Sequence, residues 1–438
     1  MASVKDFHAA SSRVAAGAKD DRPRGIMSSI SSSRREKKML RQTPAFLKSP
    51  CEVIMRYSFG SVVVLAVVAA ACGSEHADVR ASTTDSAGIN VITMRGGAGA
   101  DTLVPTRVWH VGGDDAPLLD VNDLAMTASG LVLVANNGNN TVVAFDRDGA
   151  ERWRFGRHGS GPGEFEGSLN LATVGDTTFA FEFANRRLTA IAPGGSLLRI
   201  VQIGAEEPNL ELVGGFPGGS LLFTSRHLFG PEPGINHDSV VYLRLHVDGV
   251  RAGTVGWGRR RNVEFFLGKL GPNIQNEAFG AVGDVTVHRD GVAQIDGKSP
   301  EVMIRNAEGV VTRLIRWPAQ PLSITSTDRA EFQQEQLESA ADEYRRRQAE
   351  EWLGKATWPA TMPMISRVLS RGQSQLLVAA HCLARASQCI WIGFNERGER
   401  SGTWRLPVHA TDAVASGDLL ITLSTDGNGL GRLDAWHL

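Results

Sequence analysis

The sequence is poor in cysteine, has no long apolar run and contains none of the common catalytic motifs. Its 438 residues include four cysteines, too few and too scattered for a disulfide-rich scaffold or a structural zinc module. No apolar stretch approaches the roughly 20 residues that a transmembrane helix needs. No Gly-x-Ser-x-Gly elbow, phosphate-binding loop, His-Glu-x-x-His helix or Rossmann glycine set is present. The common nucleophile and nucleotide-binding classes of enzyme therefore lack support.

The chain also lacks a large net charge, with a formal value of -1. Residues 1–71 hold 12 of the 46 Lys and Arg but only 5 of the 47 Asp and Glu, so the rest of the chain is acidic. An acidic remainder argues against nucleic acid as a partner. The hydrophobic fraction of 42%, with 48 glycines and 18 prolines, excludes both a disordered chain and a single short helical domain. A large folded body is expected.

The longest apolar run, residues 61–71, has the length of a signal-peptide h-region. It is followed by Cys72-Gly73-Ser74, which resembles the lipobox of bacterial lipoproteins, where cleavage occurs before a cysteine that carries the lipid. Ala69 stands where that family usually has Leu. We expect lipidation of Cys72, and the alternative is a plain signal peptide with a buried cysteine.

We interpret residues 55–71 as a lipoprotein-type signal peptide, because Met55-Arg56 supplies a short basic start. Residues 1–54 have no hydrophobic period, so they are disordered or lie upstream of the true translation start; the alternative is an unusually long cytoplasmic n-region. Residues 72–88 are expected to form a polar tether and residues 89–438 the folded body. The expected location is the cell envelope, outside the cytoplasm, with a lipid anchor in the membrane.

From residue 103 onward, a turn containing Gly precedes a short apolar run of strand length six times. Three of the five intervals between these glycines are 44 or 45 residues, and insertions lengthen the other two. The glycines are Gly130, Gly175, Gly219, Gly291, Gly372 and Gly417.

A second set of turns closes a following hairpin, and each needs Gly where φ is positive. Together the two sets predict four short strands in each repeat, which is typical of a β-propeller blade. The expected fold is all-β: a six-bladed β-propeller of four-stranded antiparallel blades. The second set of turns ends at Gly149, Gly195, Gly249, Gly309 and Gly398.

The last repeat lacks an outer strand before the chain ends. The expected donor is either residues 89–92 or residues 106–109, which would pair the two ends of the chain and close the ring. A helical insertion is predicted at residues 327–353, between blades 4 and 5, because no Gly or Pro interrupts it until Gly354. This helix either packs lightly on the ring or binds a partner.

The most specific motif lies in residues 146–165. A turn from Asp146 to Gly149 is followed by the stretch from Trp153 to Phe165, which ends in Gly-Pro-Gly-Glu-Phe. This motif resembles the signature of six-bladed NHL-like β-propeller lipoproteins of environmental bacteria, and residues 85–89 and 390–392 are similar to that family too. The resemblance covers residues 85–438 and implies a secreted, lipid-anchored propeller. It implies no particular reaction.

Four polar residues on the first strands of their repeats would point towards the axis of such a ring. Carboxylate and amide oxygens are the ligands that Ca²⁺ prefers, and six-bladed propellers include calcium-dependent lactonases. A metal-dependent hydrolase or lactonase is therefore the alternative function, with a divalent cation as its cofactor. The same residues can also simply solvate a wet channel. They are Asp123, Asn170, Asp284 and Asp412.

Two further groups of residues complete the predicted sites. Cys382 and Cys389 flank a short segment between two strands of the fifth repeat, and an oxidising compartment favours a disulfide between them. Arg259, Arg260 and Arg261 lie in an insertion on the face where the insertions gather, so we expect them to help bind an anionic ligand or partner; the alternative is a solvated basic loop. The predicted function is a non-catalytic binding module for an unknown ligand or protein, and no cofactor is expected for it.

Overall fold

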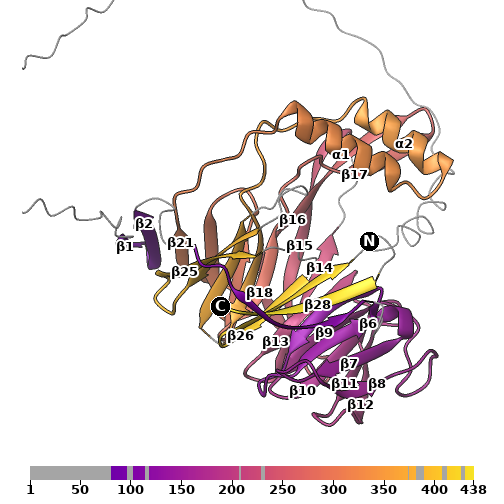
Figure 1. Ribbon diagram of the computed structural model, residues 1–438, viewed down its shortest axis with the longest axis vertical. Helices are drawn as coiled ribbons and strands as arrows, with labels where there is room; N and C mark the ends of the chain where they lie inside the picture. The colour runs from indigo at the N-terminus through magenta and orange to yellow at the C-terminus, as the bar shows by residue number, and fades with distance from the viewer. Residues whose placement is uncertain are drawn as a thin grey trace, which may run out of the picture. The chain divides into compact units, whose positions relative to one another are not determined.

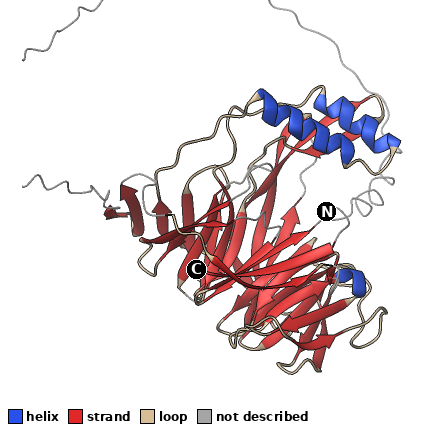
Figure 2. Ribbon diagram, in the orientation of Figure 1, coloured by secondary structure: helices blue, strands red, loops and turns tan. Residues whose placement is uncertain are grey.

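The structure of the protein is a computed structural model. It describes residues 80–95, 102–113, 118–206, 209–227, 232–372, 374–380, 389–406, 412–425 and 430–438. The chain divides into Met1–Ser74 and Glu75–Leu438, and all described residues belong to the second part. They are mostly β-structure in small antiparallel sheets, with two α-helices (Figure 2). Neither of these helices is long and apolar enough to cross a membrane.

In the described part of the chain, the strands from β5 onward form six consecutive antiparallel units. The first unit is β5 (Val121–Met126), β6 (Val132–Asn136), β7 (Thr141–Phe145) and β8 (Glu151–Phe155), with the short 3-10 helix η2 (Asn137–Asn139) between β6 and β7. The second unit is β9 (Leu169–Val174), β10 (Thr177–Glu182), β11 (Arg187–Ile191) and β12 (Leu197–Gln202). The third is β13 (Leu210–Phe216), β14 (Ser220–His227), β15 (Gly234–His246), β16 (Arg251–Gly268) and β17 (Gly271–Asn276).

The other three units follow the same order. The fourth is β18 (Asp284–His288), β19 (Gly291–Ile295), β20 (Glu301–Arg305) and β21 (Val311–Arg316). The fifth is β22 (Ile365–Arg371), β23 (Gln375–Ala380), β24 (Cys389–Phe394) and β25 (Arg400–Leu406). The sixth is β26 (Asp412–Ser416), β27 (Leu419–Thr425) and β28 (Leu430–His437). Four strands precede them: β1 (Arg80–Ser86), β2 (Ile89–Arg95), β3 (Thr106–Gly112) and β4 (Leu118–Leu119).

The first strands of the units, which we call the inner strands, contact one another in chain order. β5 contacts β9, β9 contacts β13, and the series continues through β18 and β22 to β26, which contacts β5 again. The units therefore follow one another in a cycle, as in a β-propeller.

Six hydrophobic clusters fill the spaces between consecutive units. In β6, Val132 and Val134 pack against the sixth unit, whereas Leu133 and Ala135 pack against the second. Successive side chains of a strand point to opposite faces, so a sheet covered on both faces needs a continuous apolar run. This explains why the recurring runs in the sequence are apolar without alternation.

The two sets of glycine turns lie where the sequence predicts them. The first set joins the first and second strands of the units, and five of its six glycines have φ between 59° and 91°. The exception is Gly291, because Arg289 takes the left-handed conformation in that turn with φ of 57°. All five glycines of the second set join the third and fourth strands, with φ between 80° and 86°.

The sixth unit is completed by β3, which pairs antiparallel with β28. Of the two predicted donors, residues 106–109 are therefore correct. Residues 89–92 are not the donor, because β2 pairs in parallel with β21 in the fourth unit. There Ile92 and Met94 are buried in the cluster between the fourth and fifth units. This burial explains why β2 pairs with the fourth unit and not with the sixth.

The predicted tether ends earlier than expected, because residues 80–88 belong to a hairpin. β1 pairs with β2 through a turn in which Ala87 and Gly88 have positive φ. Asp85 accepts a hydrogen bond from the Gly88 N–H at 3.1 Å, which stabilises this turn. Residues 1–79, with the predicted signal peptide and Cys72, lie outside the described residues.

The helical insertion lies between the fourth and fifth units as predicted, but it is two helices, α1 (Ser326–Glu338) and α2 (Glu343–Leu353). α1 begins at Thr325, whose side chain and Asp328 form a capping box. The break follows from a second cap: the Asp342 carboxylate accepts from the Arg345 N–H at 2.7 Å and starts α2. The prediction of one uninterrupted helix is wrong because a helix can also end and restart at a capping residue such as Asp342, without Gly or Pro.

The Gly-Pro-Gly-Glu-Phe motif forms the connection between β8 and β9. Glu164 accepts hydrogen bonds from the Gly161 N–H at 2.7 Å and from Arg157 at 2.8 Å, and these bonds lower the pKa of this carboxyl. Phe165 is fully buried between the first two units. Beneath the loop, Arg187 Nη2 lies 2.8 Å from Glu182 Oε2 in a buried ion pair. Arg187 also donates to backbone carbonyl oxygens of the loop. The motif is therefore a structural connection.

Candidate functional site

The two faces of the cycle of units differ in their connections. We call the face at which the inner strands begin the upper face, and the face at which they end in the recurring glycine turns the lower face. Connections from the second to the third strand and from one unit to the next lie on the upper face. The insertion after β16 and the two helices are therefore on the upper face, whereas the lower face consists of short turns.

Each inner strand carries a polar residue near its upper end, and we call these six residues the polar ring. Three of the predicted channel residues, Asp412, Asp123 and Asn170, are consecutive in it, because β26 contacts β5 and β5 contacts β9. All six residues are half-buried. They are Asp123, Asn170, Glu211, Asp284, Arg367 and Asp412.

Three carboxylates of the ring join one inner strand to the next. Asp123 Oδ2 accepts a hydrogen bond from the Leu171 N–H at 2.7 Å. Asp412 Oδ2 accepts from the Leu124 N–H at 2.9 Å, and Asp284 Oδ2 accepts from the Val368 N–H at 2.9 Å. The inner strands do not form regular ladders with one another, so these bonds satisfy backbone donors that face the channel. The carboxylates therefore have a structural role in the ring.

Arg367 is the cation at the centre of this charge cluster. Its Nη1 forms an ion pair with Asp412, and the side chains of the two residues are 29% and 16% exposed. Burial lowers the pKa of the Arg367 guanidinium, but the carboxylates of Asp412 and Asp284 raise it more, so the net shift is upward. Arg367 therefore stays charged and neutralises part of the ring.

Two carboxyl groups of the ring hold protons more strongly than usual. Burial and the nearby carboxylate of Asp412 raise the pKa of Asp123 well above its ordinary value, against the lowering effect of the backbone N–H groups of Leu171 and Leu124. Burial also raises the pKa of Asp284, although Arg367 acts in the opposite direction. The upper end of the channel thus combines a fixed cation with carboxyl groups that take up protons readily.

The predicted metal ligands do not come together as a metal site. They lie on four inner strands, and the described residues contain no group of three or more His, Cys, Asp or Glu that could hold a metal ion. Asp284 and Asp412 are separated in the ring by Arg367, whose cation supplies the countercharge that a divalent ion would bring. The metal-dependent hydrolase therefore gains no support from the arrangement of Asp123, Asn170, Asp284 and Asp412.

The three predicted arginines lie in a strand and not in a loop, which corrects the sequence interpretation. They belong to β16, which is 18 residues long and continues beyond its unit. Arg260 makes a two-pronged ion pair with Glu211 of the polar ring. Arg261 donates to Asn276 Oδ1 at 3.1 Å, and burial together with the charge of Arg260 lowers its pKa. Only Arg259 is exposed, so the triplet is in part a structural element of the ring.

Sequence reasoning missed two members of the polar ring, Glu211 and Arg367. Glu211 lies in a Leu-Glu-Leu sequence that matches the Leu-Asn-Leu around Asn170, and this match was an available signal. No such signal marks Arg367, because its neighbours differ from those of the other inner strands. The structure joins the channel residues and the arginines, predicted as separate sites, through the pair of Arg260 and Glu211.

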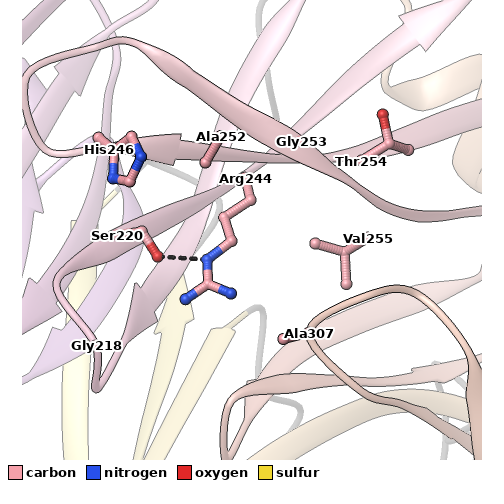
Figure 3. Close-up of a pocket in the computed structure, with 9 residues that line it drawn as sticks. All are labelled: Gly218, Ser220, Arg244, His246, Ala252, Gly253, Thr254, Val255 and Ala307. Carbon is pink, nitrogen blue, oxygen red and sulfur yellow. Dashed lines mark hydrogen bonds between the residues drawn. The ribbon is translucent and has the colours of Figure 1, made fainter.

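Two pockets open on the lower face, where the sequence predicts no site. One, of about 320 Å³, lies between the third and fourth units, and Figure 3 shows Arg244 beside Ser220 in it. Arg244 Nε donates to Ser220 Oγ at 2.6 Å, and its guanidinium lies 4.5 Å from the centre of the Phe216 ring. The other, of about 430 Å³, lies between the glycine turns of the fifth and sixth units and includes Arg371. Residues of the turns line both pockets, and Arg371 donates to the Gly417 carbonyl.

Cys389 carries a disulfide bond in the structure. Cys382 lies outside the described residues, so the pairing of the two cysteines stays a prediction.

No protein-family model and no curated protein matches the chain. Among solved structures, a member of the DUF4221 family from Bacteroides vulgatus is similar, with 10% identity and a TM-score of 0.45 over 76% of this chain and 97% of that chain. A protein of Bacteroides fragilis that is described as exported has 10% identity and a TM-score of 0.42 over 76% of this chain and 94% of that chain. Virginiamycin B lyase from Staphylococcus aureus has 10% identity and a TM-score of 0.39 over 75% of this chain and 98% of that chain.

Proposed function

We propose that the protein is a six-bladed β-propeller, held outside the cytoplasm by a lipid on Cys72, that acts as a non-catalytic binding module through its upper face. The cyclic contacts of six inner strands and the six clusters between units support the blade number. The sequence around Cys72 supports the anchor.

The observation that carries the choice of face is the position of the polar ring. Its charged side chains lie on the face that also carries the long β16 and the two helices. Charged groups with shifted pKa values that gather in the same place as insertions are typical of a binding surface. On the lower face, the described residues form short turns, and the pockets there are lined by these turns.

The binding role is supported over catalysis by the way in which the ring is built. The oxygens of Asp123, Asp284 and Asp412 accept from backbone N–H groups of neighbouring strands, and Arg367 and Arg260 are held in ion pairs. A catalytic acid or base needs freedom to exchange a proton with a substrate at close range. Groups that hold strands together are better suited to present a fixed polar surface.

The anchor predicts a modified N-terminus. Intact-mass measurement of protein extracted from membranes should find a chain that begins at Cys72 and carries the additional mass of a lipid. A Cys72→Ala variant should lack this mass, and Cys51→Ala should retain it, because only Cys72 follows the apolar run. An unmodified chain with a different N-terminus would contradict the anchor.

The binding face is tested by photocrosslinking in cells. A photoreactive amino acid in place of Arg259, exposed on the upper face, should give discrete crosslinked species. The same group in place of Asp148, exposed in a turn of the lower face, should give none, because that turn is placed away from the ring. Equal crosslinking from both positions would show that the upper face is not the binding surface.

A further inference from the structure

Part of the third unit extends well beyond the cycle of inner strands. β14 pairs with β15 only as far as His227 and Ser239, whereas β15 and β16 continue to pair up to Gly234 and Phe265. β17 then returns alongside β16 from Gly271. We call residues 234–238 and 262–276 the arm. Five residues of β15 from Ser239 to Gly234, and three more of β16 from Phe265 to Gly268, lie past the upper end of β14. At about 3.3 Å per residue, the arm reaches roughly 26 Å past that end.

The two helices hold the arm rigidly on one side, and Figure 1 shows α1 and α2 beside β17. Trp352 Nε1 donates to Glu264 Oε2 at 2.9 Å, and Asn273 Nδ2 donates to the Gln348 carbonyl at 3.0 Å. At the tip, the Lys269 N–H donates to both oxygens of Glu351, at 2.8 and 3.0 Å. A small core with Trp352 and Phe332 fills the space between arm and helices.

The tip of this rigid arm exposes apolar side chains. Leu267 is 68% exposed, Ile274 is 47% exposed and Leu270, in the turn, is 38% exposed. Leu267 and Ile274 lie on the face of the arm opposite Glu264 and Asn273, because side chains alternate along each strand. The helices therefore cover one face of the arm and leave an apolar tip on the other.

Polar and aromatic groups border this apolar tip. Tyr344 of α2 is half exposed, and its hydroxyl donates to the Leu270 carbonyl at 3.3 Å. Lys269 lies in the turn itself. An apolar tip with a tyrosine and a lysine beside it is the combination found where proteins contact the boundary between water and lipid.

The N-terminal hairpin shows from which face the anchored segment leaves. β21, an outer strand, ends at the upper face, and β2 runs parallel to it. β1 runs antiparallel to β2, with Arg80 opposite Arg95, so Arg80 lies at the upper end of the fourth unit. The seven residues between Cys72 and Arg80 allow a span of at most about 28 Å. A lipid on Cys72 would thus hold the upper face close to the membrane.

We propose that the tip of the arm, with Leu267 and Leu270, docks on the lipid surface and sets the distance between the upper face and the bilayer. This inference rests on the proposed lipid anchor, which supplies the closeness and the orientation. The reach of the arm, roughly 26 Å, is just within the maximum span of the tether, about 28 Å, so the anchor on an extended tether and the arm can touch the same bilayer. The third and fourth units, which carry the arm and Arg80, are neighbours in the ring.

The test uses the chain from Glu75 to Leu438, which is one compact unit and carries no lipid. Flotation with vesicles of phosphatidylethanolamine and phosphatidylglycerol measures its binding to a bilayer. Leu267→Ser with Leu270→Ser should weaken that binding roughly tenfold, because two exposed leucines lose their transfer into the lipid boundary. The matched control is Val250→Ser with Val310→Ser, two valines each 59% exposed in turns of the lower face, which should bind as the unmodified chain does.

A second measurement uses the unmodified chain, so it does not depend on whether a variant folds. On adding vesicles, amide hydrogen exchange should slow in residues 265–274 and stay unchanged in residues 247–251. Equal vesicle binding by the two double variants, or no vesicle binding by the unmodified chain, would overturn the proposal. The exposed tip would then be a contact surface for a protein partner. The mass of the Cys72 terminus is measured separately, so a missing lipid and an inert arm are distinguishable results.

Discussion

A chain that begins at Gly113, and therefore lacks β3, should fail to unfold cooperatively in a thermal or denaturant transition. β3 is the outer strand of the sixth unit, and its removal leaves β28 unpaired on that side except at Leu430 and Gly431, which pair with β4. It also uncovers the cluster between the sixth and first units, against which Trp109 and Val111 pack. The loss is comparable with the whole free energy of unfolding of a domain, about 5–15 kcal/mol. Circular dichroism during thermal unfolding measures it.

Two controls separate strand closure from chain length. A chain that begins at Thr102 keeps β3 and should retain a cooperative transition, lowered by the loss of β1 and β2. Within the full chain, Val111→Asp should be far more destabilising than Val108→Asp, because Val111 packs into the cluster whereas Val108 is 57% exposed at an irregularity in the pairing. Equal unfolding midpoints for the chains that begin at Thr102 and Gly113 would show that β3 does not stabilise the sixth unit.

Replacing Arg367 by Met should lower the free energy of unfolding by about 3 kcal/mol at neutral pH, the lower end of the range for breaking a buried ion pair. We use the lower end of that range because the Arg367 side chain is 29% exposed, so solvent screens part of the interaction. The substitution keeps most of the side-chain volume but leaves Asp412 and Asp284 without their cation. Urea unfolding monitored by tryptophan fluorescence measures the change.

The same variant has a predictable dependence on pH. Arg367 holds down the pKa of Asp284, so its removal raises the pKa of that carboxyl in the folded state. A carboxyl whose pKa is higher in the folded than in the unfolded state favours folding at low pH, and this contribution is lost as the pH rises through the folded value. The difference in stability between Arg367→Met and the unmodified chain should therefore grow from acidic to neutral pH.

An exposed ion pair provides the matched control. Arg154 Nη2 lies 2.8 Å from Glu151 Oε2, and both side chains are more than two-fifths exposed. Arg154→Met should cost less than about 1 kcal/mol with little dependence on pH. If Arg367→Met is as mild as Arg154→Met, the polar ring does not stabilise the closure of the inner strands.

Much of the fold could be predicted because its determinants are local in the sequence. A turn that needs positive φ selects glycine wherever it recurs, so Gly149, Gly195 and their counterparts mark hairpins without reference to the rest of the chain. The continuous apolar runs between them report a sheet that is covered on both faces. Spacing and composition therefore indicate small four-stranded antiparallel units in a repeating order.

The candidate site could be predicted only in part. The residues Asp123, Asp284 and Asp412 were found because each begins or lies near the start of a predicted inner strand. Their hydrogen bonds to neighbouring inner strands could not be predicted, because these bonds depend on which backbone N–H groups of the next unit face the same channel. Glu211 needed an alignment of repeats, and Arg367 had no local signal at all.

By itself, the sequence determined the repeating strands, their turns and the apolar character of the signal-like segment before Cys72. Only the tertiary structure decided which N-terminal strand closes the sixth unit, that Arg260 pairs with Glu211, and that the residues after Arg259 continue as a strand into an arm. These choices depend on contacts between segments far apart in the chain, such as β3 with β28 and Trp352 with Glu264. Local propensity is similar for all the candidate segments, so burial and pairing in the assembled ring select among them.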